Sequence, residues 1–285
     1  MPDPKRHPTR PPVALSIAGS DPSGGAGIQA DLKTFSALGT YGTCVITALT
    51  AQSTRTVTMV HPIPVPVVRE QLTTLVEDVR IDVVKVGMLG SAELIEMIHD
   101  VLTDGPLRTT PVVLDPVMVS SVGTPLLAAD ALAALRALVS RVDVVTPNLP
   151  EAAVLLDEPA AASVSEMQRQ AERLVGAGAS RVLLKGGHLE GERSVDVWLD
   201  SSGGAVTRLS APRVATRDTH GTGCTLSSAV AAFYPRRGDW LPAVRAAKEW
   251  LTGALRHGPV LDIGHGPGPV HHFYEQTRWH EEPAP

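Results

Sequence analysis

Residues 218–225 read DTHGTGCT and open a strongly helix-forming stretch, so they carry the side chains and amides best suited to chemistry. The first backbone N–H groups of a helix have no partner within the helix, and the helix dipole favours negative charge there. We therefore predict that Gly221, Thr222 and Gly223 stabilise an anion such as a transferring phosphoryl group. Cys224 lies in the first turn, where a thiol pKa falls from about 8.5 toward neutrality and the thiolate can act as a base. The alternative is a small residue that merely packs the start of the helix.

A second glycine-rich turn follows the first apolar run of the chain. Residues 19–27 read GSDPSGGAG, and such a turn lets backbone N–H groups approach a ligand closely. It is not a Walker loop, because Gly25 and Ala26 stand where that motif has Lys and Ser or Thr. A dinucleotide-binding turn needs an acidic residue about 20 positions later, and residues 32–69 contain no Asp or Glu. A ligand-binding turn and a purely structural turn are the interpretations left open.

Oxygen-bearing side chains follow two of the apolar runs where the predicted strands end. Asp115 ends one strand, and Asn148 and Glu151 follow the next. The carboxyl ends of parallel strands converge on a ligand crevice, and Mg²⁺ prefers hard oxygen ligands while keeping several waters. These residues therefore suit a magnesium site, with helix capping as the alternative for the two carboxylates. Lys185 closes another strand and is predicted either to hold a phosphate or to form an ordinary salt bridge.

Short apolar runs alternate with stretches of helical periodicity over the first two thirds of the chain. Strands are predicted at 13–18, 43–49, 83–87, 111–115, 142–146 and 181–185. Helices are predicted near 26–38, 68–79, 91–102, 128–139 and 165–177. This alternation predicts an α/β fold with a mainly parallel central sheet and helices on both faces.

The pattern changes after residue 186. Alternating runs near 195–199 and 205–209 are separated by Ser-Ser-Gly-Gly, which predicts a hairpin and therefore antiparallel strands at one edge of the sheet. Two further helices are predicted, over about 223–233 and about 240–257.

No internal linker divides the chain into two cores. We predict a single domain over residues 13–274, preceded by a disordered, proline-rich tail of residues 1–12. Residues 275–285 are predicted to form a C-terminal tail. The first segment lacks the apolar stretch that a signal peptide requires.

The composition argues against several classes of function. A net charge of −5 gives no general attraction to nucleic acid or to an anionic membrane surface. No window approaches about 18 uninterrupted apolar residues, so no membrane span is predicted. Cys44 and Cys224 are too few for a disulfide scaffold, and reduced thiols fit a cytoplasmic location.

A series of motifs lies in order along the chain from about residue 13 to residue 274: AGSDPSGGAGIQAD (18–31), VITAL (45–49) with Gln52, KVGML (85–89), DPVM (115–118), TPNLPEA (146–152), KGGH (185–188), THGTGCTL (219–226), GHG (264–266) and PVHH (269–272). Together these motifs closely resemble the hydroxymethylpyrimidine/phosphomethylpyrimidine kinases of thiamine biosynthesis. These kinases belong to the ribokinase-like superfamily. The resemblance implies a ribokinase-like domain that uses ATP and Mg²⁺ to phosphorylate 4-amino-5-hydroxymethyl-2-methylpyrimidine and then its monophosphate, and it implies a homodimer.

The resemblance also assigns roles by position. Gln52, Asp21 and Gly19 are expected at the pyrimidine, and Lys185 and Thr219 at ATP or its phosphates.

Three further assignments concern the reacting groups, and the first is that the glycine-rich segment 221–223 resembles the anion hole of the superfamily. Cys224 takes the place where sugar kinases of the superfamily have an aspartate base. The stretch from Asn148 to Glu151 resembles the element that holds the hydrated magnesium, with Asp115 nearby.

One position departs from the family pattern. Ser121 stands where the family loop commonly has a lysine, so either Lys185 neutralises more of the phosphate charge or the second phosphorylation is weak.

Two other functions compete with that of a pyrimidine kinase. A pyridoxal or pyridoxine kinase is the nearest rival, because its substrate is also a flat nitrogen heterocycle with a hydroxymethyl arm. Gln52 suits an amino-pyrimidine edge and favours the pyrimidine. A non-catalytic pyrimidine-binding protein is the other alternative, and the retained carboxylates and Cys224 argue against it.

Overall fold

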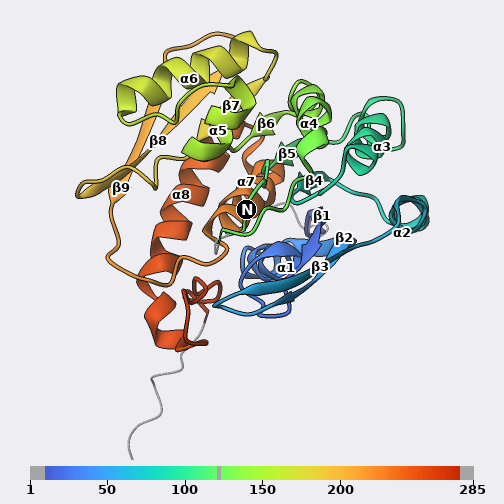
Figure 1. Ribbon diagram of the computed structural model, residues 1–285, viewed down its shortest axis with the longest axis horizontal. Coiled ribbons are helices and arrows are strands. Elements are labelled where there is room, and N and C mark those ends of the chain that lie inside the picture. The colour runs from blue at the N-terminus through green and yellow to red at the C-terminus, as the bar shows by residue number, and fades with distance from the viewer. Residues whose placement is uncertain (1–9, 121–122, 277–285) are drawn as a thin grey trace, which may run out of the picture.

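The computed structural model describes residues 10–120 and 123–276. Within these residues the chain forms one nine-stranded sheet. The strands are β1 (Val13–Ser20), β2 (Tyr41–Gln52), β3 (Val57–Pro62), β4 (Val83–Val86), β5 (Val112–Leu114), β6 (Val144–Val145), β7 (Arg181–Leu184), β8 (Arg193–Asp200) and β9 (Thr207–Pro212). They lie in the order β3-β2-β1-β4-β5-β6-β7-β8-β9 (Figure 1).

The centre of the sheet is parallel and both of its edges are antiparallel. Strands β2, β1, β4, β5, β6 and β7 pair in parallel with their neighbours. Strand β3 pairs antiparallel with β2 at one edge, and β7, β8 and β9 pair antiparallel at the other. A mainly parallel sheet must be covered on both faces, because its strands are buried on both sides.

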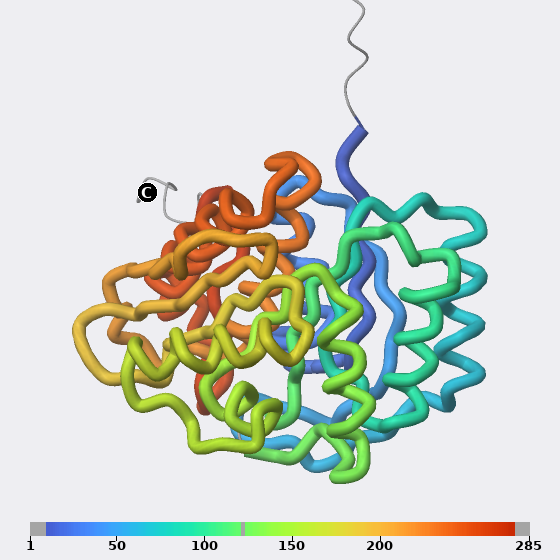
Figure 2. The backbone as a smooth tube through the Cα atoms, turned by 90° about the horizontal axis from the view of Figure 1, so that it is seen from above, coloured from blue at the N-terminus to red at the C-terminus, as the bar shows by residue number. Residues whose placement is uncertain are grey.

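Helices cover both faces of this sheet. They are α1 (Gly27–Ala37), α2 (Val65–Asp78), α3 (Ala92–Thr103), α4 (Leu132–Val139), α5 (Leu149–Leu156), α6 (Val164–Gly176), α7 (Thr222–Arg237) and α8 (Trp240–Arg256), with short 3-10 turns η1 (Ala129–Ala131) and η2 (Gly258–Leu261). Helices α2 to α6 pack into one hydrophobic core, and α1, α7 and α8 into the other. In Figure 2 the orange and red helices α7 and α8 accordingly lie on the opposite side of the sheet from the green and yellow helices α4 to α6.

The two cores divide the side chains of each central strand between them. Val112 and Leu114 of β5 point into the first core, whereas Val113 points into the second. Successive side chains of a strand point to opposite faces, so a run of apolar residues serves both cores at once. None of the helices in the described residues is long and apolar enough to cross a bilayer.

The predicted α/β class and the antiparallel hairpin at one edge are confirmed. The sequence patterns missed β3, a second antiparallel edge strand, and the eight-residue helix α5. Residues 1–9 and 277–285, parts of the two predicted tails, lie outside the described residues, as does Ser121.

Candidate active site

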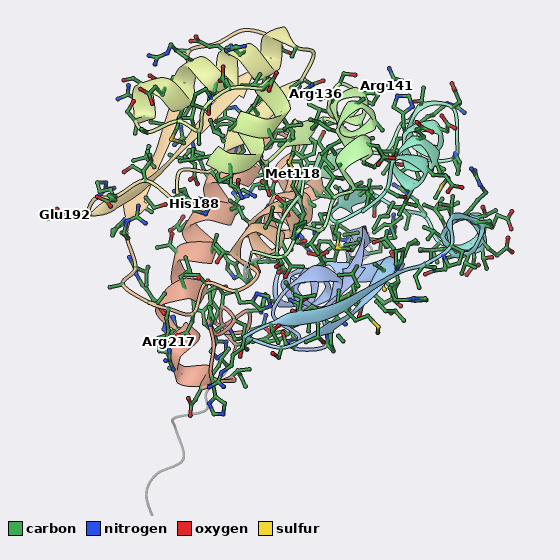
Figure 3. All side chains as sticks on the ribbon, viewed as in Figure 1. Met118, Arg136, Arg141, His188, Glu192 and Arg217 are labelled. Atoms are coloured by element: carbon green, nitrogen blue, oxygen red, sulfur yellow. The ribbon has the colours of Figure 1, made fainter. Side chains whose placement is uncertain are left out.

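A cavity of about 730 Å³ lies where the carboxyl ends of the parallel strands meet the start of α7. Its wall includes every residue to which the sequence assigned a role: Gly19, Asp21, Gln52, Asp115, Asn148, Glu151, Lys185, Thr219, Gly221, Thr222, Gly223 and Cys224. Met118 and His188, which come from the loops after β5 and β7, also contribute to the wall and are labelled in Figure 3. The topology therefore gathers, in one place, segments that lie 200 residues apart in the chain.

The glycine-rich turn before α7 has a conformation that only glycine tolerates. Gly221 precedes the helix with φ = 73°, and a Cβ atom there would lie 1.7 Å from the carbonyl oxygen of Gly25. The hydroxyl of Thr222 donates to the carbonyl of Thr219 at 2.6 Å, which tightens the turn. Helix α7 thus presents its first turn to the cavity, and the N–H groups of that turn have no partner within the helix. This arrangement suits an anion.

Cys224 is half-buried in the wall of the cavity, and its thiol is not poised as the sequence predicted. Burial raises the pKa of the Cys224 thiol to about 11. The Lys85 ammonium and the Gly27 N–H act in the opposite direction, but Asp31 and Asp115 add to the effect of burial. The prediction of a lowered pKa is therefore wrong for the protein without substrates, because desolvation outweighs the helix N-terminus.

A fully buried ion pair lies beneath the first turn of α7. The Lys85 ammonium lies 2.8 and 2.9 Å from the two carboxylate oxygens of Asp31. The hydroxyls of Ser16 and Ser228 also donate to that carboxylate, at 2.6 and 2.7 Å. The cluster links β1, α1, β4 and α7. The sequence offered a signal for it, because a lysine in the middle of the apolar run VVKVG needs a buried counter-charge.

Lys185 joins the two carboxylates that were assigned to the metal. Its ammonium lies 2.7 Å from Asp115 Oδ1 and 3.8 Å from Glu151 Oε2. Asn148 and Glu151 also form a reciprocal cap on α5: the Asn148 side chain accepts from the Glu151 N–H, and the Glu151 carboxylate accepts from the Asn148 N–H, both at 2.8 Å. Helix capping and a place in the cavity wall are therefore compatible for Glu151.

The donors in this part of the cavity fit Mg²⁺. Asp115 and Glu151 offer carboxylate oxygens, and Asn148 lies beside them. Within residues 10–120 and 123–276, no group of three or more His, Cys, Asp or Glu side chains could hold a metal by protein ligands alone. Mg²⁺ typically takes only one or two carboxylates and completes its shell with water and substrate phosphates. The carboxylates present are sufficient for that kind of site.

Burial raises the pKa of Glu151 to about 7, although the Lys185 ammonium acts against this and Asp115 adds to it. The folded protein therefore binds more protons than the unfolded chain between the ordinary pKa of about 4.3 and pH 7. The contribution of Glu151 to the free energy of unfolding is fully present below that pH range and is lost as the pH rises through 7. We expect the free energy of unfolding of the parent to fall by about 2 kcal/mol more than that of Glu151→Gln between pH 5 and pH 8.

Urea unfolding of the protein without substrates at the two pH values measures this difference. Glutamine keeps the acceptor that caps α5, so the comparison isolates the charge. Parallel pH dependences of parent and variant would contradict a raised pKa at Glu151.

Another part of the cavity holds the residues assigned to the pyrimidine. Gln52 ends β2 with its amide nitrogen 3.4 Å from His220 Nε2. A Cβ atom on Gly19 would lie 3.2 Å from the Met88 sulfur, so glycine keeps this wall open. Asp21 lies in the same wall, but its carboxylate accepts hydrogen bonds from protein groups on both oxygens.

The model of the phosphomethylpyrimidine kinase family matches residues 21–271 of this sequence. The chain belongs to this family. The hydroxymethylpyrimidine/phosphomethylpyrimidine kinase of Escherichia coli (strain K12) is 52% identical over 262 residues, which are 92% of this chain and 97% of that protein.

Solved structures agree with membership of the phosphomethylpyrimidine kinase family. The phosphomethylpyrimidine kinase of Clostridium difficile 630 is 38% identical with a TM-score of 0.73, over 86% of this chain and 99% of that one. An ADP complex of Bacillus subtilis pyridoxal kinase is 34% identical with a TM-score of 0.84, over 93% and 99% of the two chains. The family and the ribokinase-like fold predicted from the motifs are thereby confirmed.

Proposed function

We propose that this protein transfers the γ-phosphoryl group of ATP to the hydroxymethyl oxygen of 4-amino-5-hydroxymethyl-2-methylpyrimidine, and then phosphorylates the resulting monophosphate. The observation that carries the proposal is the single cavity, which holds Gln52, the turn at 221–223 and the Asp115–Lys185 pair together. The name of the Escherichia coli relative, at 52% identity, supports the same substrates. Relatives solved as ADP and AMP-PCP complexes support ATP as the donor.

Each residue of the cavity is assigned one role in phosphoryl transfer. Catalysis of this reaction consists mostly of positioning the reactants and stabilising charge. Gln52 and Gly19 hold the flat heterocycle, so that its hydroxymethyl arm points toward Cys224. The N–H groups at the start of α7 stabilise the charge on the transferring group. Lys185, together with Thr219, holds the ATP phosphates. Cys224 accepts the hydroxyl proton through the thiolate form that its raised pKa leaves in the minority.

Asp115 and Glu151 are proposed to hold Mg²⁺, with Asn148 beside it. Bound Mg²⁺ neutralises phosphate charge and orients the donor. Lys185 already links the two carboxylates and keeps them from repelling each other in the absence of the ion.

We also propose that residues 13–274 form a single kinase domain that works in the cytoplasm as a homodimer. Large apolar side chains are exposed on neighbouring elements at the β3 edge: Leu49 on β2, Met59 on β3 and Val67 on α2. Exposed apolar residues gathered at one edge support a contact face between copies. Analytical ultracentrifugation of the parent and of Met59→Glu tests that face.

Parallel turnover assays with Mg-ATP test the function. We expect kcat/KM for the hydroxymethylpyrimidine to exceed that for pyridoxine by at least about tenfold, because Gln52 matches an amino-pyrimidine edge. Pyridoxine kinase is the second candidate, and the TM-score of 0.84 with a pyridoxal kinase favours testing it. A preference for pyridoxine would reverse the assignment. No ATP consumption with either substrate would indicate a binding protein.

Removal of divalent metal should abolish turnover of both pyrimidine substrates. The carboxylates of Asp115 and Glu151 lie in the cavity, and ATP carries a charge that Lys185 alone cannot neutralise. The measurement is ATP-dependent product formation in excess chelator, followed by titration with Mg²⁺. Full activity in chelator would rule out a metal requirement.

A further inference from the structure

The two glycine-rich turns of the cavity touch each other through their backbones. We call residues 19–27 the first glycine-rich turn and residues 218–223, which precede and begin α7, the second glycine-rich turn. A Cβ atom on Gly221 would lie 1.7 Å from the Gly25 oxygen, and one on Gly25 would lie 2.3 Å from a ring carbon of His220. Neither glycine could therefore carry a side chain unless the two turns moved apart.

A buried side-chain contact joins the same two turns. His220 Nε2, from the second glycine-rich turn, lies 2.8 Å from Asp21 Oδ2, from the first. The other donors to this carboxylate come from its own turn: the N–H of Ser23 at 2.8 Å and its hydroxyl at 2.7 Å reach Oδ1, and the Ala26 N–H reaches Oδ2 at 2.9 Å. Asp21 thus organises the first glycine-rich turn and fastens the second glycine-rich turn to it.

Both partners are inaccessible, and the carboxylate keeps its charge. The side chains of Asp21 and His220 are each only 4% exposed. Burial alone would raise the pKa of Asp21, but the hydrogen bonds from His220 and Ser23 outweigh burial and lower it. A hydrogen bond to a buried charged group is stronger than one between neutral groups, and losing it leaves the charge unsatisfied.

The pair also reaches the residue assigned to the pyrimidine. The same His220 ring nitrogen, Nε2, lies 2.8 Å from the Asp21 carboxylate and 3.4 Å from the Gln52 amide nitrogen. His220 immediately precedes Gly221, the residue from which α7 begins. The His220 side chain therefore contacts the part of the cavity that is assigned to the pyrimidine, while its backbone leads into the turn that is proposed to bind the phosphoryl group.

We propose that Asp21 and His220 are positioning residues that fasten the second glycine-rich turn to the first and so hold the start of α7 in line with the acceptor. This role rests on the proposed phosphoryl transfer but differs from the substrate contact that the family resemblance assigns to Asp21. The oxygens of Asp21 already accept from protein groups, whereas the pair connects the two turns on which the geometry of transfer depends.

Breaking the pair should lower kcat rather than raise KM for ATP. We expect Asp21→Asn and His220→Leu each to reduce kcat of both phosphorylations by about tenfold to a hundredfold, with KM for ATP changed less than about threefold. The double variant should lose no more than the worse single variant, because the two residues act as one unit. His220→Gln, which keeps a side-chain N–H donor, should recover most of the activity.

Asp200 provides a matched control elsewhere in the chain. Its carboxylate accepts from the N–H and hydroxyl of Ser202 at 2.9 and 2.7 Å, and from Arg181 Nε at 2.7 Å. Asp200 therefore resembles Asp21 in its contacts: each carboxylate accepts from a serine two residues later and lies against a nitrogen-bearing side chain from another segment. Asp200 ends β8, and it is not part of the cavity wall. Asp200→Asn should leave kcat unchanged.

Amide hydrogen exchange of residues 219–226 provides a readout that does not depend on turnover. Exchange there should accelerate in Asp21→Asn and His220→Leu, but not in Asp200→Asn or His220→Gln. Unchanged exchange and kcat in the first two variants would overturn the proposal even if the parent phosphorylates the pyrimidine. If the parent turned over no pyrimidine, the proposed function would be refuted, whereas faster exchange in Asp21→Asn and His220→Leu than in that parent would still support the fastening role. Additive losses in the double variant would also contradict a single unit.

Discussion

Replacing Cys224 with alanine should slow the first phosphorylation by about 10²–10⁴-fold, the range typical of a positioned base, and should largely spare the second. The first acceptor is a neutral alcohol, whose proton must leave as the new bond forms. The second acceptor is a phosphate monoester with a pKa near 6, so at pH 7 to 8 it is already mostly dianionic and needs no proton removed. The measurement supplies hydroxymethylpyrimidine and its monophosphate separately with Mg-ATP and compares each rate with the parent.

The pH dependence of the two steps should differ for the same reason. Burial raises the pKa of Cys224 to about 11, so the thiolate fraction grows about tenfold for each pH unit between 7 and 9. We expect the first rate of the parent to follow that rise, the second rate to stay nearly flat, and the rise to disappear in Cys224→Ala.

Cys44 serves as the matched control, because it is also half-buried but is not part of the cavity wall. Cys44→Ala should therefore leave both rates close to those of the parent. Equal fractional losses of the two reactions in Cys224→Ala would show that Cys224 shapes the anion site and is not a step-specific base.

The strand and helix positions were largely predictable, because a parallel sheet covered by helices produces a simple pattern of apolar residues in the sequence. Each buried strand is a short apolar run, and each covering helix has apolar residues three or four apart. Strand β3 breaks that pattern, since Val57–Pro62 is an edge strand with mostly exposed or half-buried residues and a terminal proline. Helix α5 was hidden by Pro150 in its first turn, although the Asn148 cap and Glu151 three residues later form a helix-start signal.

The residues of the site were predictable as a set, but their protonation was not. Strand ends and helix starts converge by topology, so motif positions alone bring Asp115, Lys185 and Cys224 together. The pKa of a thiol depends instead on burial and on every charge around it. Asp31, which raises the pKa of Cys224, lies 193 positions earlier in the sequence and showed no link to it before folding.

Two pairs of residues that lie far apart in the sequence meet at the cavity. Lys85 and Asp31 form a buried ion pair below α7, and Asp21 and His220 join the two glycine-rich turns. Each pair unites residues from distant segments, and even where a buried lysine signals the need for a counter-charge, the sequence does not show which residue supplies it. Long-range side-chain pairs of this kind follow from packing, which periodicity cannot reveal.

Gly223→Ala should abolish most phosphoryl transfer without weakening the fold. A Cβ atom at this position would lie 3.2 Å from the Lys185 ammonium and 3.4 Å from Asp115 Oδ2. Lys185 cannot easily yield, because it is held 2.7 Å from Asp115. The added methyl group would therefore occupy space beside the first turn of α7, where we propose that the phosphoryl group approaches. Losing one such stabilising contact typically costs about 10²–10³-fold in rate, and we expect both phosphorylations to lose that much.

The stability of the same variant separates this effect from damage to the fold. Alanine is a better helix former than glycine by about 1 kcal/mol in a helix interior. At Gly223, in the first turn of α7, that gain is opposed by the close contact with Lys185, so the thermal midpoint of Gly223→Ala should stay near that of the parent. Gly176→Ala is the matched control, because Gly176 ends α6 and a Cβ atom there meets nothing within 4 Å. The control should keep full activity. If Gly223→Ala kept kcat within about threefold of the parent for both substrates, the amides at the start of α7 would not be the groups that stabilise the transferring phosphoryl charge.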